Sequence, residues 1–164
     1  MSTGHRDESD VVDPEAAFKD AQSLLQAGEL LFAGTEESVF NCILCQRNKK
    51  QLRCIFDKYE ENVGHPIEKA IQNEFSGAAK DAMLQLIHCI RDKTDYLVTR
   101  LHDSMAGIGT DDRTLIRIVV SRSEIDLVEI KQAYELKYGK SLADAISDDV
   151  SDDYKKALLG LIGD

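Results

Sequence analysis

Apolar residues recur along this chain at spacings of three and four, which is the pattern of amphipathic helices. Segments 39–44 and 52–59 show it clearly, and segments 115–119 and 127–134 show it again further along the chain. Additional helical patterns lie at 18–25, 67–71, 82–90, 96–105, 142–146 and 157–162. No segment has a convincing strand pattern, so the sequence predicts an all-α protein.

The sequence of the second half of the chain resembles that of the first half. Gly34-Thr35 aligns with Gly109-Thr110 at an offset of 75 positions, 109 minus 34. The same offset, continued without gaps, matches residues of identical type from one end of the repeat to the other. These pairs include Ile43 with Ile118, Arg47 with Arg122, Leu52 with Leu127, Ile55 with Ile130, Tyr59 with Tyr134, Gly64 with Gly139 and Ile71 with Ile146. A fixed period of this length indicates a duplicated structural unit, here with about five helices in each copy.

Polar residues and glycines suggest where several helices begin and end. Thr35, Ser123 and Ser141 are candidate N-caps, because a short side-chain oxygen there accepts from a free backbone N–H. Gly64 and Gly139 follow apolar helical segments and are typical of helix C-termini. These signals predict helix boundaries at matching places in the two copies.

The domain organisation follows from the repeat. Residues 1–13 are polar and acidic and are expected to form a linker or tail. Residues 14–90 form the first repeat and residues 91–164 the second. The connection around Arg91 is too short for a flexible linker, so we expect the two repeats to pack side by side, with the inter-helix loops of both on one face.

Charge and composition narrow the function classes. Twenty Lys and Arg residues against 30 Asp and Glu give a net charge of −10, which repels nucleic acid and anionic lipid at long range. No run of about 18 apolar residues predicts a membrane span, and the polar start of the chain lacks the apolar stretch of a signal peptide. Four cysteines without a second Cys-x-x-Cys pair make a zinc site a weak interpretation, so we expect reduced thiols in an intracellular protein.

One loop carries candidate metal chemistry. Gly107 and Gly109 lie between two predicted helices, and Asp149 follows 40 positions after Gly109. In the first repeat Glu74 follows Gly34 at the same distance. Glycine lets a loop turn its carbonyl oxygens outward, and carbonyls with one bidentate carboxylate make a calcium ligand set. The alternative is that the glycines only end a helix and Asp149 is a solvated acid.

These residues resemble the annexin family. The resemblance rests on the Gly-x-Gly-Thr-Asp-Asp loop and on segments 115–127, 138–142 and 151–156, and it covers about residues 4–164. Annexins usually carry four repeats, and this chain resembles the third (14–90) and the fourth (91–164). We therefore expect half of a longer molecule, or a short form of one.

The resemblance implies two calcium sites. The second repeat is expected to bind calcium through the carbonyls of Met105, Gly107 and Gly109 and the carboxylate of Asp149. The corresponding candidates in the first repeat are Gly28, Phe32, Gly34 and Glu74. The first-repeat loop is one residue longer than the family pattern, which leaves open whether its carbonyls are aimed at the ion.

Two further residues depart from the family pattern near the second site. Ala106 stands where the family usually has a basic residue, and Asp152 stands where it usually has Gly. Asp tolerates left-handed backbone better than most residues.

The expected function is calcium-dependent binding to anionic phospholipid membranes, with Ca²⁺ bridging loop oxygens and lipid phosphate. Leu31, Phe32 and Ile108 are apolar loop-tip residues that are candidates for entering the membrane interface. This implies a cytoplasmic protein that is peripheral on membranes when calcium is present.

Alternative functions remain open at this point. The main one is a calcium-independent helical scaffold that binds a protein partner through its repeat surface. No nucleophile motif, phosphate-binding loop or dinucleotide fingerprint is present, so we expect no enzyme. A half-molecule that lacks its partner repeats also raises the possibility of a homodimer of two such halves.

Overall fold

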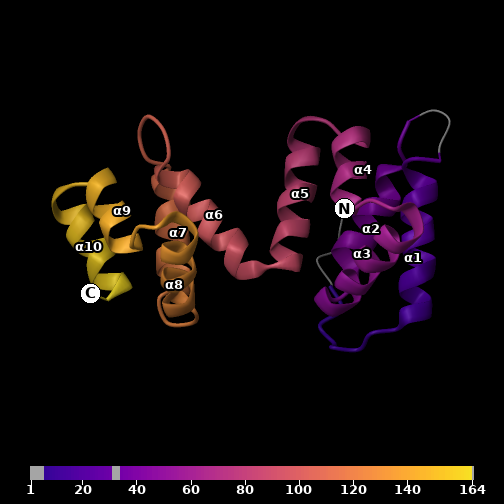
Figure 1. Cartoon of the computed structure of the whole chain (residues 1–164), viewed down its shortest axis with the longest axis horizontal. Coiled ribbons are helices and arrows are strands. Elements are labelled where there is room, and N and C mark those ends of the chain that lie inside the picture. The colour runs from indigo at the N-terminus through magenta and orange to yellow at the C-terminus, as the bar shows by residue number, and fades with distance from the viewer. Residues whose placement is uncertain (1–5, 31–33, 164) are drawn as a thin grey trace. The chain divides into compact units, whose positions relative to one another are not determined.

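The computed structural model describes residues 6–30 and 34–163, and these residues contain ten helices and no strand. The chain divides into two compact units, Met1–Arg91 and Asp92–Asp164, each with five helices (Figure 1). The first unit contains α1 (Pro14–Ala27), α2 (Glu37–Gln46), α3 (Lys49–Val63), α4 (Ile67–Glu74) and α5 (Gly77–Arg91). The second contains α6 (Lys93–Met105), α7 (Asp112–Arg122), α8 (Leu127–Tyr138), α9 (Leu142–Asp149) and α10 (Asp152–Ile162). The prediction of an all-α fold with five helices per repeat is confirmed.

Each unit has its own hydrophobic core. In the first, α1 packs mainly on α3, and Phe40 and Phe75 meet edge to face with ring centroids 5.0 Å apart. In the second, α6 packs on both α7 and α8 around Leu101, Leu115 and Ile130, which are fully buried. The apolar stripes of the sequence face these two cores, and their burial is the main stabilising contribution to each unit.

Several helix ends follow the sequence signals. Gly64 and Gly139 end α3 and α8 in the left-handed conformation, with φ of 81° and 67°. A side chain with a Cβ atom is disfavoured there, which explains glycine at both C-caps. The Ser141 hydroxyl accepts a 3.0 Å hydrogen bond from the Asp144 backbone N–H and caps α9 as expected.

Two expected N-caps are wrong. Helix α2 begins at Glu37 rather than beside Thr35, because the Thr35 hydroxyl donates to Glu74 instead of accepting from the helix. Helix α8 begins at Leu127, and the Ser123 hydroxyl donates to the Val120 carbonyl near the end of α7. In both cases a tertiary or neighbouring bond replaces the cap that local sequence favours.

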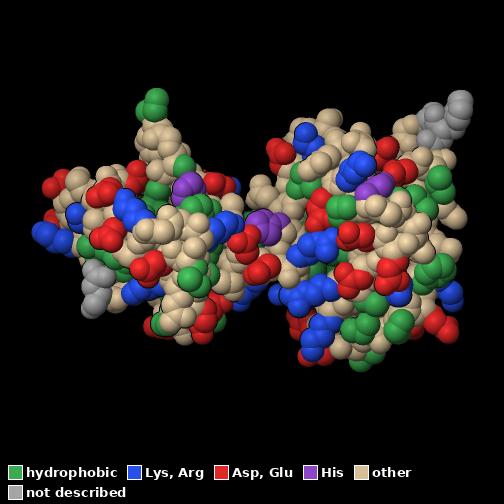
Figure 2. Space-filling view, viewed as in Figure 1, with side chains coloured by type: hydrophobic (Ala, Val, Ile, Leu, Met, Phe, Trp, Pro, Cys, Tyr) green, Lys and Arg blue, Asp and Glu red, His purple; other side chains and the backbone are tan. Residues whose placement is uncertain are grey.

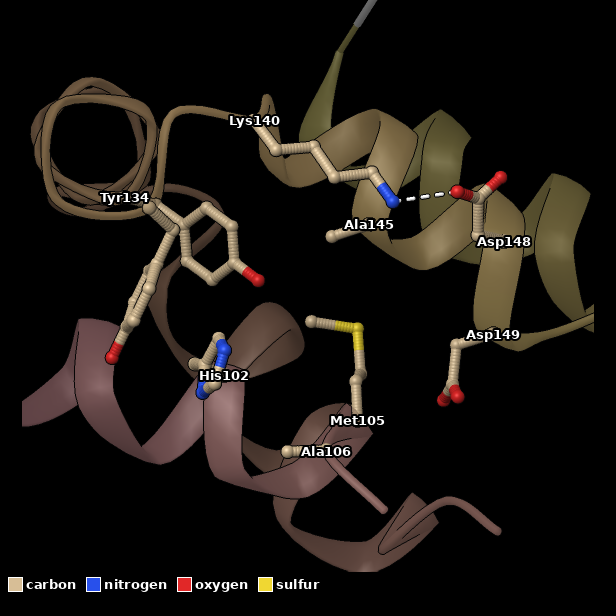
Figure 3. Close-up of a pocket in the computed structure, with 9 residues that line it drawn as sticks. His102, Met105, Ala106, Tyr134, Lys140, Ala145, Asp148 and Asp149 are labelled. Atoms are coloured by element: carbon tan, nitrogen blue, oxygen red, sulfur yellow. Dashed lines mark hydrogen bonds and ion pairs between the residues drawn. The ribbon is translucent and has the colours of Figure 1, made fainter. Parts of the chain in front are cut away.

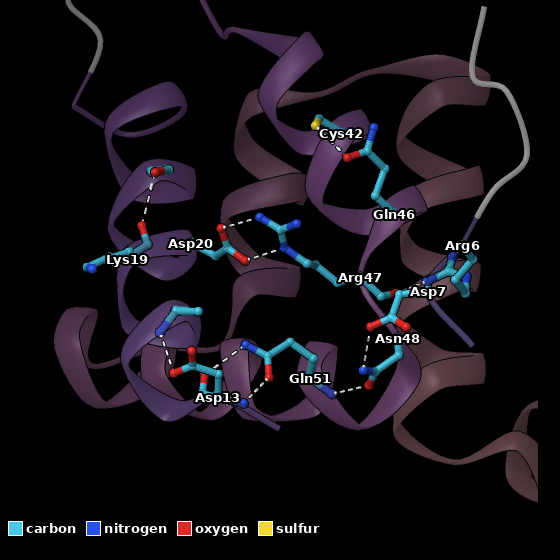
Figure 4. Close-up of polar contacts among 12 residues, drawn as sticks. Arg6, Asp7, Asp13, Lys19, Asp20, Cys42, Gln46, Arg47, Asn48 and Gln51 are labelled. Carbon is cyan, nitrogen blue, oxygen red and sulfur yellow. Dashed lines mark hydrogen bonds and ion pairs between the residues drawn. The ribbon is translucent and has the colours of Figure 1, made fainter. Parts of the chain in front are cut away.

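The described part of the acidic N-terminal segment is held against the first unit (Figure 4). Arg6 donates to the carbonyls of Arg47 and Leu44 at 2.6 and 2.8 Å, where the last carbonyls of α2 lack helical partners. Asp13 caps α1, and its backbone N–H donates to Gln51 at 2.8 Å. Residues 6–13 are therefore hydrogen-bonded to the end of α2 and to the first turn of α3.

An ion pair links two helices of the first unit. Arg47 forms a two-bond pair with Asp20 at 2.7 and 3.0 Å, joining α1 to the end of α2. All four cysteines are free, and Cys42 is exposed. None of the helices within 6–30 and 34–163 combines the length and apolar character needed to cross a bilayer.

Candidate metal sites

The loop between α6 and α7 is built on two glycines with positive φ. Gly107 has φ 110° and Gly109 has φ 84°, conformations that strongly favour glycine. The Asp111 backbone N–H donates to the Ser104 carbonyl at 2.8 Å and closes the loop at its base. Ile108 at the tip is fully exposed, and hydrophobic atoms are seen there in Figure 2. A closed, glycine-rich loop of this kind can present several carbonyl oxygens to one ion.

Asp149 is held beside this loop by Thr110. The Thr110 hydroxyl donates a 2.6 Å hydrogen bond to Oδ2 of Asp149, which joins the start of α7 to the last residue of α9. Met105 and Asp149 also line the same pocket (Figure 3). The structure therefore brings together the carboxylate, Met105 at the end of α6 and the loop that contains Gly107 and Gly109.

The first unit repeats this arrangement with a longer loop. Thr35 donates to Oε2 of Glu74 at 2.9 Å, and Gly34 has φ 80°. The Glu36 N–H donates to the Ala27 carbonyl at 2.8 Å, so this loop is closed by the same kind of bond. Gly28 is the C-cap of α1, and its role as a carbonyl ligand stays a prediction. Leu31 and Phe32 lie outside the described residues, so the carbonyl expected from Phe32 stays a prediction.

The two candidate carboxylates are partly buried, and neither has a cationic partner among the described residues. Within the described ranges, Asp149 and Glu74 form no ion pair, whereas the neighbouring Asp148 pairs with Lys140 at 2.5 Å. Burial, followed by the nearby carboxylates of Asp112 and Asp149, raises the pKa of Tyr154 to about 12. The site in the second unit thus has a local excess of negative charge, which favours a cation.

The donor set determines which metal these residues fit. The described part of the chain has no group of three or more His, Cys, Asp or Glu side chains placed to hold an ion. A metal at Asp149 would therefore take most of its ligands from backbone carbonyls and water. One carboxylate with several neutral oxygens in a flexible loop fits Ca²⁺, which accepts six to eight oxygens in irregular geometry.

A polar cluster beside the first loop was not predicted. The Tyr59 hydroxyl donates to Glu29, and His65 Nε2 lies 3.1 Å from the other Glu29 oxygen. Burial is the main cause that raises the pKa of Tyr59, and the Glu29 carboxylate adds to it. Glu29 lies 30 and 36 positions from these partners, so no local motif connects them. The sequence contains one hint that this position matters, because the offset of 75 places a tyrosine at both Tyr59 and Tyr134.

Comparison with known proteins gives a consistent result. A family model described as Annexin matches residues 19–86 and 96–161. Human annexin A11 is 47% identical over 163 residues, which cover 99% of this chain and 32% of that protein. Annexin A4 of Canis lupus familiaris is 45% identical over 99% of this chain and 51% of its own length.

Solved structures agree with the sequence comparison. Annexin III superposes with a TM-score of 0.93 and 44% identity, over 98% of this chain and 49% of that one. The structure of calcium-bound annexin (Sm)1 superposes with a TM-score of 0.80 and 35% identity, over 94% and 41%. The chain thus spans between about a third and a half of the length of these relatives. With both repeats matched by the family model, the chain belongs to the annexin family.

Proposed function

We propose that this chain binds anionic phospholipid membranes in a calcium-dependent manner. The observation that supports this most directly is the juxtaposition of the Gly107–Gly109 loop and Asp149, which has no cationic partner in the part of the chain that the structure describes. The calcium-bound structure of annexin (Sm)1 shows that a related protein binds this ion. The proposed activity is binding rather than catalysis.

The residues of the second unit have separate roles in this proposal. The carbonyls of Met105, Gly107 and Gly109 and the carboxylate of Asp149 hold the ion, and Thr110 keeps that carboxylate turned toward the loop. Calcium bound there supplies open coordination positions to phosphate oxygens of the lipid. The carbonyls are neutral, so the ion keeps a net positive charge toward the membrane.

The charge of the chain explains why an ion is required. A protein of net charge −10 is repelled by an anionic leaflet, and the first turn of α7 beside the loop is itself acidic. Binding of the divalent ion offsets two of the negative charges at the loop and places a cation where the loop meets the leaflet. Protein, ion and lipid then bind as a linked system, in which each component raises the affinity for the others. We therefore place the protein in the cytoplasm, and on membranes when calcium is present.

Ile108 adds an apolar contact to this mechanism. Its side chain is fully exposed at the loop tip, where contact of its apolar surface with water is unfavourable. Once the loop reaches the headgroups, the side chain can enter the interfacial region, which stabilises the bound state by the hydrophobic effect. The same loop thus offers an ion-mediated contact and an apolar contact.

Co-sedimentation with vesicles tests the proposal. Vesicles of phosphatidylcholine with 30% phosphatidylserine, about a typical anionic surface, are mixed with the chain in calcium or in chelator. We expect pelleting only in calcium, reduced by Asp149→Asn. Pelleting that is equal in calcium and chelator, or absent in both, would contradict it. Calcium-independent capture of a protein partner would favour the scaffold alternative.

A further inference from the structure

A pocket of about 300 Å³ lies next to the candidate metal site in the second unit (Figure 3). Its walls come from α6, α8 and α9, from the start of the loop after α6 and from the connection between α8 and α9. They consist of His102, Met105, Ala106, Tyr134, Tyr138, Lys140, Ala145, Asp148 and Asp149. In Figure 3 Tyr134 and His102 lie on one side of Met105, and Asp149 lies on the other. The pocket therefore has an aromatic end and a charged end.

The same place in the first unit contains a carboxylate of the chain itself. Glu29 accepts from the Tyr59 hydroxyl, and its second oxygen lies 3.1 Å from His65. The carboxyl side chain is about one-quarter exposed, so this interaction is well shielded from water. Tyr59 and His65 thus form a ready carboxylate-binding pair in that unit, and Glu29 occupies it.

The two units can be aligned residue by residue at this point. The loop-closing bonds Glu36 to Ala27 and Asp111 to Ser104 make Ala27 equivalent to Ser104. Two positions later, Glu29 is then equivalent to Ala106. The ungapped offset of 75 pairs Tyr59 with Tyr134 and His65 with Lys140. The second unit therefore keeps a tyrosine and a basic residue but has alanine in place of the acid.

Tyr134 is left with an unused donor. The residue as a whole is 3% exposed, and its hydroxyl makes no hydrogen bond to another described residue. The hydroxyl oxygen itself is not fully buried, in contrast to the Tyr154 hydroxyl, which is buried without a partner among the described residues. His102 stacks on Tyr138 at 3.9 Å between ring centroids and completes the aromatic end. Solvent reaches this hydroxyl at the pocket, so it is available to donate to an acceptor from outside the chain, as Tyr59 donates to Glu29 in the first unit.

We propose that this pocket binds a carboxylate from another molecule, which accepts from Tyr134 and faces Lys140. These two residues are equivalent to Tyr59 and His65, which hold Glu29 in the first unit. Lys140 also pairs with Asp148 at 2.5 Å, and a bound carboxylate would share its ammonium group. The charged residues of the pocket are Lys140, Asp148 and Asp149, which sum to −1 without metal. A Ca²⁺ ion held by Asp149 changes this sum to +1. Carboxylate and calcium binding are therefore positively coupled, and this part of the inference rests on the proposed function.

The carboxylate can come from a lipid headgroup or from a free acid. Serine headgroups carry a carboxylate next to the phosphate, whereas glycerol headgroups carry the same net charge without one. Acetate is the smallest free probe. The two sources share one chemistry, so the same pocket variants test both of them.

The experiment uses the full chain and three variants. Sodium acetate is titrated at constant ionic strength, with and without calcium, and the ring signals of His102 and Tyr134 are followed by NMR. Ala106→Glu restores the acid of the first unit inside the pocket, and Tyr134→Phe removes the donor. Tyr59→Phe is the matched control, because it removes the same hydroxyl where Glu29 already occupies the place.

We expect a saturable acetate effect that is at least threefold tighter with calcium. It should weaken at least threefold in Tyr134→Phe, disappear in Ala106→Glu and stay unchanged in Tyr59→Phe. Vesicles with phosphatidylserine or phosphatidylglycerol at equal charge then identify the source. A serine preference that both pocket variants remove assigns the headgroup carboxylate, and acetate binding without such a preference assigns a free acid.

Other results would overturn the inference. Acetate binding that is absent, or that is the same in wild type and in both pocket variants, shows that the pocket is not a carboxylate site. Calorimetry of calcium binding without acetate separates this from failure of the proposed function. If calcium binds and acetate does not, only the pocket is wrong; if calcium itself does not bind, the proposed function and the coupling both fail.

Discussion

The Thr110 hydroxyl donates a 2.6 Å hydrogen bond to the carboxylate of Asp149, which lies 39 residues later in the chain. Thr35 and Glu74 form the same relationship in the first unit at 2.9 Å and at the same separation. In each unit the bond fixes a carboxylate at the end of one helix against a glycine-containing loop before another. A carboxylate held in this way loses less freedom when it binds an ion.

Removing this hydroxyl should weaken calcium binding. Thr110→Val keeps the shape of the side chain but leaves Asp149 free to rotate away from the loop. We expect calcium affinity in the second unit to fall about two- to fivefold, or roughly 0.5–1 kcal/mol, by isothermal calorimetry. Thr110→Ser retains the hydroxyl and should bind calcium nearly as the wild type does. Equal affinities in all three proteins would show that Thr110 does not position Asp149.

Removing the carboxylate itself should have a larger effect. In Asp149→Asn the charge is lost while the size is kept, so we expect at least a tenfold loss, about 1.4 kcal/mol or more. Asp148→Asn is the matched control, since Asp148 is adjacent but pairs with Lys140. Glu74→Gln should affect only a weaker site, because we expect the extra residue in the first-unit loop to misaim its carbonyls. A larger loss in Glu74→Gln than in Asp149→Asn would reverse this order.

The exposed loop-tip side chain gives a separate test of membrane binding. Replacing Ile108 with Ser removes the apolar contact and leaves the carbonyl ligands in place. We expect calcium affinity in solution to stay the same and vesicle binding to fall about fivefold or more, consistent with ~1–2 kcal/mol for partial burial of the side chain. Ile125→Ser, at the other end of α7 and 67% exposed, is the control. Equal losses in both variants would point to general hydrophobicity instead.

The helices could be predicted from the sequence because the apolar spacing and the capping residues indicate the same helical segments. The apolar stripes, the left-handed glycines at 64 and 139 and the Ser141 cap all act within one or two turns of helix. The internal offset of 75 also predicted that Glu74 and Asp149 occupy equivalent places. Periodicity and duplication are properties of the sequence alone, so neither required a tertiary structure.

The misplaced caps and the polar clusters depend on contacts that are distant in sequence. Thr35 has the right residue type for an N-cap, but Glu74 lies within its reach only in the folded unit. Glu29 likewise meets Tyr59 and His65 across three separate elements. Local propensity is a weak guide where a buried tertiary partner offers a stronger bond. The equivalence of Ala106 and Glu29, on which the carboxylate proposal depends, is found only by comparing the loop-closing bonds of the two folded units.

Stability at acid pH should depend on Asp126. Arg122 donates to it twice at 2.6 Å and Lys93 lies 2.5 Å away, which lowers the pKa of Asp126 to about 2. Because the folded pKa is below the ordinary value, this contribution is full above about pH 4 and is lost as the pH falls toward 2. In thermal unfolding at pH 7, Asp126→Asn should cost about 1–2 kcal/mol, and the difference should shrink by pH 2.5.

Asp153→Asn serves as the control for this prediction. Asp153 pairs with Lys156 at 3.0 Å, but both side chains are largely exposed, so the pair contributes little at any pH. A loss in Asp126→Asn that is the same at pH 7 and pH 2.5 would show that packing or capping, rather than its charge, is what Asp126 contributes.

Backbone conformation at Asp152 gives the last test. Asp152 has φ 56° and is the one non-glycine residue with positive φ among residues 6–30 and 34–163, while Gly77, its equivalent at the offset of 75, has φ 59°. The two units therefore make the same left-handed turn before their last helix, at a cost that only the second unit bears. Asp152→Gly should raise the free energy of unfolding by about 0.5–1 kcal/mol, measured by thermal or denaturant unfolding. Asp153→Gly, one position further into α10, should lower it, because glycine there has only its entropic cost. The Asp152 side chain accepts from the Ser151 hydroxyl at 3.1 Å. If both glycine variants are destabilised alike, loss of this hydrogen bond costs more than relief of the left-handed backbone strain gains.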